Sequence, residues 1–264
     1  MKILIETSTL VSASISWEYT LRGRTRIVEH KFYGVCNLLF SICNDREMQS
    51  DVILTKTVED EARNVLSRAV NKTIRQRAPR GLRQRYNIMV LQHLILNDSL
   101  DKLDYYVEEC SIRLPVDISV RNEICDSEIE PYLKEIAKNT LRFIHPQISR
   151  VVRGKDFRAE LIKIMIDSLP EKGIVYKGMP EDRDIIIMAE ATLLKRKDED
   201  EEPFYVASKD NHFKPNPIQV FSYRSRDMMF LDELDSTIRD MLHEKFGFIG
   251  EDPQEINRIL QESI

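Results

Sequence analysis

Short runs of β-branched and other apolar residues recur along the chain, separated by long stretches in which apolar positions have helical spacing. The five runs are KILIE (2–6), DVILT (51–55), SIRLPV (111–116), FYVAS (204–208) and IQVFS (218–222). Neighbouring parallel strands need a long connection, usually a helix, whereas antiparallel strands can be joined by a tight turn. The alternation of runs and helical stretches therefore predicts an α/β fold with a parallel sheet.

Helical spacing is clear between the runs. Phe32, Val35, Leu39 and Ile42 fall on one face of a helix. Residues 185–194, IIIMAEATLL, are apolar nearly all round, which predicts a helix that lies deep against the sheet. Further helices are predicted over residues 57–77, 83–109 with a break possible at 97–98, 119–172, 228–246 and 253–263.

These elements predict one α/β domain over residues 1–225, with helical elaborations at about 67–108 and 119–172. Residues 226–264 are expected to form a helical extension that packs on this domain or on a partner, which leaves a homodimer open. The composition, 42% hydrophobic and 31% charged, is that of a globular protein. No apolar run approaches the about 18 residues of a membrane helix.

The four cysteines form no CxxC pair, so we expect free thiols in a reducing cytoplasm. The N-terminal residues lack the features of a signal peptide. The expected location is therefore cytoplasmic, with no membrane partner.

Basic residues are concentrated in one segment although the net charge is −5. Residues 62–97 contain no Asp or Glu, and around a Pro-Arg-Gly sequence they include Arg75, Arg77, Arg80, Arg83 and Arg85. The planar guanidinium group suits phosphate, so this segment predicts a track that binds nucleic acid. The alternative is a solvated surface that pairs with acidic residues such as DEDEE (198–202). A second, smaller basic loop contains Arg22, Arg24 and Arg26.

Four acidic residues lie at or after the carboxyl ends of predicted strands, where ligands of parallel sheets gather. They are Glu6 after the first run, Glu61 in the helix after the second, Asp184 at the start of helix 185–194 and Asp210 after the fourth run. Each alone is an ordinary helix-cap or surface acid. Together they would repel one another unless a cation neutralised them. An all-oxygen ligand set favours Mg²⁺ or Mn²⁺ over zinc.

The order of these motifs resembles the PIN-domain family of metal-dependent nucleases. The similar segments are IETSTLVSA (5–13), EARNVL (61–66), SIRLPVD (111–117), DIIIMAEA (184–191) and SKDNHF (208–213). The resemblance implies a three-layer α/β/α fold around a five-stranded parallel sheet in the order 3-2-1-4-5. It also implies endonucleolytic RNA cleavage with one or two Mg²⁺ or Mn²⁺ ions, with Glu6, Glu61, Asp184 and Asp210 as catalytic metal ligands. Ser8 and Ser208 would orient carboxylates or metal-bound waters. Glu59 competes with Glu61 for the second position.

The chain departs from the family at Glu6, where the usual residue is Asp. The extra methylene extends the side chain by about 1.5 Å. Either the site is adjusted to the longer side chain, which the retained acids favour, or the nuclease is weakened. A catalytically silent RNA-binding or assembly module is therefore the alternative function. A receiver-like or phosphatase-like domain is a weaker alternative, because the first strand offers no Asp nucleophile. His212 and Lys209 rank below the acids, with Lys209 expected to be exposed.

Overall fold

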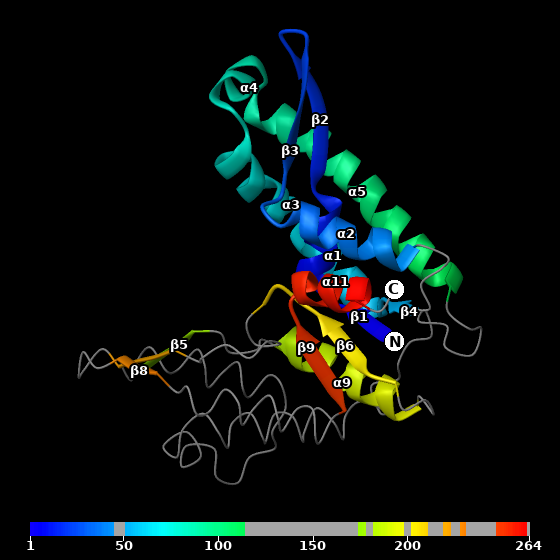
Figure 1. The fold of residues 1–264 in the computed structure, drawn as a ribbon. Coiled ribbons are helices and arrows are strands. Elements are labelled where there is room, and N and C mark those ends of the chain that lie inside the picture. The colour runs from blue at the N-terminus through cyan, green and yellow to red at the C-terminus, as the bar shows by residue number, and fades with distance from the viewer. Residues whose placement is uncertain are drawn as a thin grey trace. The chain divides into compact units, whose positions relative to one another are not determined.

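A computed structural model describes residues 1–44, 51–113, 174–177, 182–197, 202–210, 219–222, 228–230 and 247–262. The chain divides into two compact units. The first contains Met1–Asn122, Ala207–Lys209 and Glu251–Ile264, and the second contains Glu123–Val206 and Asp210–Gly250. The ribbon is shown in Figure 1.

The protein is an α/β protein with a four-stranded parallel sheet, as the alternating pattern predicts. The strand order is β4-β1-β6-β9, formed by Asp51–Ile53, Lys2–Ile5, Phe204–Ala207 and Phe248–Glu251. Strands β1 and β4 pair in parallel, with Ile3 opposite Val52 and Leu4 opposite Ile53. Ile3, Leu4 and Ile5 have no exposed surface, so β1 lies in the core.

Three of the five predicted strands, at 51–55, 2–6 and 204–208, are neighbours in the predicted order. The fourth strand of the sheet, β9, comes from the tail that was expected to be helical. Gly247, at a φ of +75°, precedes β9 and allows a backbone conformation that other residues rarely adopt. The apolar run of β9 is short and ends at Gly250, which is why spacing alone did not reveal a strand.

The other two predicted strands lie elsewhere. Gln219–Ser222 forms β7, which pairs antiparallel with β5 (Ile174–Lys177) and β8 (Met228–Phe230) in a separate sheet of the second unit. The prediction of a helix over 228–246 is therefore wrong at its start, because Met228–Phe230 pairs with a strand. Residues 111–113 end a helix instead of starting a strand, and residues 114–116 lie outside the described part of the chain.

The helices of the first unit largely follow the predictions. Helix α3 (Lys56–Arg77) is confirmed, and its buried side chains recur every four residues from Val58 to Ile74. The predicted helix at 83–109 is instead α4 (Arg80–Arg85) and α5 (Ile88–Arg113). Helix α5 has no break at 97–98, and the buried Ile95 and Leu103 pack on either side of that position.

The remaining helices of this unit are α1 (Thr7–Ser14), α2 (Tyr33–Asn44) and α11 (Pro253–Glu262). Helix α1 packs against α2, α3 and α5, and α2 also packs against α11. Cys36 and Cys43 on α2 are buried and in the thiol form, as expected from the absence of CxxC pairs.

A β-hairpin occupies the region that was predicted to be a basic loop. Strand β2 (Ser16–Leu21) pairs antiparallel with β3 (Arg24–Glu29), and the turn residues Arg22 and Gly23 have φ values of 53° and 73°. Two positive φ values define a type I′ turn, whose twist suits a hairpin. The hairpin contacts α5 through β2 and α3 through β3. It can be followed in blue in Figure 1.

In the second unit, helix α9 (Asp182–Lys197) confirms the predicted helix at 185–194. Its Ile187, Met188, Ala189 and Ala191 are buried, consistent with a sequence that is apolar nearly all round. The predicted helices at 119–172 lie outside the described residues. Within the described residues, no helix has the length and apolar character needed to span a membrane.

Candidate functional site

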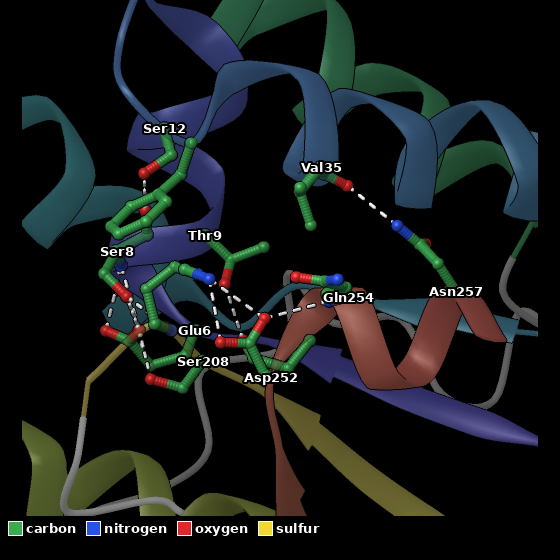
Figure 2. Close-up of polar contacts among 12 residues, drawn as sticks. Glu6, Ser8, Thr9, Ser12, Val35, Ser208, Asp252, Gln254 and Asn257 are labelled. Carbon is green, nitrogen blue, oxygen red and sulfur yellow. Dashed lines mark hydrogen bonds and ion pairs between the residues drawn. The ribbon is translucent and has the colours of Figure 1, made fainter. Parts of the chain in front are cut away.

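The Glu6 carboxylate lies buried where the central strand β1 passes into helix α1. Glu6 is 2% exposed and is the N-cap residue of α1. Its two carboxylate oxygens accept the backbone N–H of Ser8 at 3.0 Å, and Oε2 also accepts the hydroxyl groups of Ser8 and of Ser208, the latter at 2.9 Å. Figure 2 shows these three residues converging. The hydroxyl and amide donors thus hold a charged group that would otherwise be costly to bury.

The backbone around Glu6 fixes this arrangement. The Glu6 N–H donates to Ala207 O at 3.0 Å, and the Thr9 hydroxyl donates to the same carbonyl at 2.9 Å. The end of β1 and the end of β6 are therefore joined at the residue that carries the acid. A negative charge at the first turn of α1 is also favoured by the helix dipole.

Glu61 reaches the same end of the sheet from α3. The Thr7 hydroxyl donates to Glu61 Oε2 at 2.8 Å, and Thr7 is the residue next to Glu6. The competing residue, Glu59, instead forms ion pairs with Lys56 and Arg63 on the surface of α3. Glu61 is therefore the acid that the structure brings to the first turn of α1.

Lys209 links the candidate site to the C-terminal helix. Its backbone N–H donates to Ser8 Oγ at 3.1 Å, and its Nζ lies 2.8 and 2.9 Å from the carboxylate oxygens of Asp252. The Lys209 side chain is only 10% exposed, so the expectation that it is solvated is wrong. The Asp252 carboxylate, which also accepts the N–H of Gln254, provides the counter-charge.

Sequence reasoning missed two residues that the Lys209 side chain contacts. These are Asp252, which forms the ion pair, and Phe32. The Lys209 ammonium lies 4.1 Å from the centre of the Phe32 ring. The sequence Asp-Pro at 252–253 is a helix-start signal that could have marked Asp252 as an N-cap. No local signal connects Asp252 with Lys209, which is 43 residues earlier in the chain.

Asp184 and Asp210 belong to the second unit. Asp184 is 8% exposed in the first turn of α9, and Asp210 is half-buried after β6. The convergence of these two acids on Glu6 and Glu61 stays a prediction. Within the described part of the chain, no group of three His, Cys, Asp or Glu side chains is arranged to hold a metal ion. His212 lies outside that part.

The side chains around Glu6 carry the type of oxygen ligand that a hard cation prefers. Carboxylates from Glu6 and Glu61 and hydroxyls from Thr7, Ser8 and Ser208 are the polar side-chain groups that meet there. Mg²⁺ and Mn²⁺ prefer such oxygen ligands. Burial raises the pKa of the nearby Cys36 thiol to about 12.

The five arginines of the basic segment are all exposed, on the last turn of α3 and on α4. Arg63, earlier on α3, pairs with Glu59 and Asp104. For the five arginines themselves, no ion pair with another described residue is recorded, and Arg85 lies 5.7 Å from the Tyr86 ring centre. Pairing with residues 198–201 falls outside the described residues.

Comparison of the chain with protein-family models, curated proteins and solved structures gives no match. The resemblance to PIN domains therefore depends on the motifs of the sequence alone.

Proposed function

We propose that this protein is a Mg²⁺- or Mn²⁺-dependent endoribonuclease with a PIN-like fold, and that Glu6, Glu61, Asp184 and Asp210 are its acidic site. The observation that carries the proposal is the buried Glu6 carboxylate at the carboxyl end of β1. Glu61, from the helix after the neighbouring strand β4, binds the adjacent Thr7. Ligands of parallel sheets bind beyond this end of the strands.

The fold proposal includes the five-stranded order 3-2-1-4-5 and the three layers. It is supported by the adjacency of β4, β1 and β6 in that order. In this proposal β9, beside β6, takes the place that the sequence suggested for residues 218–222.

The hydroxyl groups of Ser8 and Ser208 orient the Glu6 carboxylate and restrict its rotation. Glu6 and Glu61, joined by Asp184 and Asp210, would hold the cation. When bound, the ion supplies a Lewis acid for a phosphate oxygen and lowers the pKa of a water. The exposed arginines bind the RNA backbone, and base recognition is not indicated because Tyr86 is the only aromatic residue among them.

A catalytically silent RNA-binding module is the second candidate, and one observation favours it. The Glu6 carboxylate already accepts three donor groups, one backbone N–H and two hydroxyls, and caps a helix, which is a complete structural role. A displacement of about an ångström at a catalytic group can lower a rate on the order of a hundredfold.

Cleavage and binding of single-stranded RNA distinguish the two functions. The protein is incubated with RNA and Mn²⁺ or Mg²⁺, alongside Asp184→Asn and Asp60→Asn, the latter an exposed control acid that pairs with Lys56. A nuclease cleaves the RNA in the native and Asp60→Asn proteins and loses activity in Asp184→Asn. Tight binding without cleavage in any of the three proteins would identify the binding module.

A further inference from the structure

Helix α3 connects the candidate site to the basic segment, because it carries Glu61 near its start and Arg77 at its end. His30 follows β3 and donates its N–H to Ile15 O. Burial and, to a smaller extent, the charges of Lys31, Lys72 and Arg77 together lower the pKa of His30 to about 4. The imidazole is therefore neutral at pH 7, and β3, which precedes it, contacts α3, the helix that carries Lys72 and Arg77.

Phe32 contacts both Lys31 and Lys209. Its ring is flanked by two ammonium groups, with Lys31 Nζ 4.3 Å and Lys209 Nζ 4.1 Å from the ring centre. The backbone N–H of Lys209 donates to Ser8 Oγ, and Ser8 binds the Glu6 carboxylate. A ring between two cations gains cation–π energy from both, which favours their staying close despite mutual repulsion.

The two lysines differ in what they can still bind. Lys209 is nearly buried and paired with Asp252, so its charge is compensated within the protein. Lys31, Lys72 and Arg77 are exposed, and no ion pair with another residue in the described ranges is recorded for them. Lys72 and Arg77 lie on α3 between Glu61 and α4, as does the exposed Arg68, and Lys31 follows β3, which contacts α3.

We propose that Arg77, Lys72 and Lys31 form a phosphate-binding path that leads a single RNA strand from the arginines of α4 to the acidic site at Glu6. This inference rests on the proposed function, and it names the route that the substrate takes. Lysine and arginine bind phosphate through charge and N–H donors without reading bases. The neutral His30 lies beside the path and adds no charge to it.

The test measures RNA affinity in EDTA, so that cleavage plays no part. A short uridine oligonucleotide is titrated at several salt concentrations with the native protein, the Lys31→Gln/Lys72→Gln double variant and Lys56→Gln. Lys56 is a matched control, because it is an exposed lysine on the first turn of α3 that pairs with Glu59 and Asp60. All three substituted lysines are exposed, and thermal melting verifies that each variant is folded.

The path predicts weaker binding by the double variant and a salt dependence that is shallower by about 0.7 in log–log slope for each lost phosphate contact. Lys56→Gln should keep the native affinity and slope. Unchanged slopes in the double variant, or no RNA binding by the native protein, would overturn the path. The nuclease proposal is tested separately by Mn²⁺-dependent cleavage of RNA. The phosphate-binding path can therefore be supported when no cleavage is seen, and cleavage can be seen when the path is overturned.

Discussion

At the scale of single residues, the candidate site is a carboxylate held by hydroxyl groups. A buried hydrogen bond to a charged acceptor contributes more than one between neutral groups, because the acceptor cannot recover the interaction from water. Ser208 is the donor that reaches Glu6 from another strand, and it has no exposed surface. Removing the Ser208 hydroxyl therefore tests how much its hydrogen bond to the Glu6 carboxylate contributes to stability.

Ser208→Ala should lower the free energy of unfolding by about 1.5–3 kcal/mol, the range for hydrogen bonds to charged groups. Urea denaturation at neutral pH measures this change. Ser41→Ala is the control, because its hydroxyl bonds to Asn37 O on an exposed turn of α2, and it should change stability by no more than about 0.5 kcal/mol. Equal effects of the two substitutions would contradict the role given to Ser208.

His30 makes stability depend on pH with a defined sign. Its pKa is about 4 in the folded protein, against an ordinary value of 6.5, so the unfolded chain takes up the proton first as the pH falls. The contribution of His30 is therefore complete above pH 6.5 and is lost as the pH falls toward 4.

His30→Gln removes this proton uptake. Relative to the native protein, the variant should become progressively more stable as the pH is lowered through that interval. Urea denaturation of both proteins across the interval gives the difference, and a difference that is independent of pH would show that His30 titrates normally.

At the scale of elements, strand β9 and helix α11 support the site through the Lys209–Asp252 ion pair. Asp252 caps α11 and also neutralises an ammonium group that is 10% exposed. The two roles can be separated, because Asn caps a helix about as well as Asp but carries no charge.

Asp252→Asn should lower the free energy of unfolding by about 1.5–3 kcal/mol through loss of the charged bond, and Asp252→Ala by roughly 1 kcal/mol more through loss of the cap. Thermal or urea unfolding of the two variants measures both terms. If Asp252→Asn has no further effect in a Lys209→Met background, the loss of stability in Asp252→Asn comes from the Lys209–Asp252 ion pair.

Sequence patterns predicted the elements that are long or continuously apolar. Helix α3 and strand β1 followed from spacing and from an unbroken apolar run. Strand β3, RTRIVE, was missed because its side chains are almost all exposed, so no buried face imposes alternation. Strand β8 was missed because its three residues gain their conformation only by pairing with β7.

The positions of the candidate acids were predictable only in part. Glu6 and Glu61 were found because both follow strands whose ends meet in a parallel sheet. Only the structure shows that Glu61, and not Glu59, contacts Thr7, since the two acids lie two residues apart on one helix and point in different directions. The Lys209–Asp252 pair joins distant parts of the chain and leaves no spacing to recognise.

At the scale of the whole molecule, the proposed function needs acids from both units to bind one cation site. A ligand that binds only the folded state raises stability by about 2.7 kcal/mol at a concentration one hundred times its Kd. Stabilisation by Mn²⁺ therefore reports on the site without requiring catalysis.

Mn²⁺ should raise the melting temperature of the native protein, and Glu6→Gln, Glu61→Gln, Asp184→Asn and Asp210→Asn should each reduce the increase. Asp60→Asn should leave it intact. A loss confined to the Glu6 and Glu61 variants would place the cation in the first unit alone and remove Asp184 and Asp210 from the site.

The Lys209–Asp252 contact has a consequence for the order in which the protein is made. Asp252 leaves the ribosome long after Glu6, Glu61 and Ser208 have been synthesised. A nascent or truncated chain that ends before residue 248 therefore carries the acids but lacks the partner that fixes Lys209 beside them. Such a chain would therefore show whether the Lys209–Asp252 ion pair is needed for the acids at Glu6 and Glu61 to take up their positions.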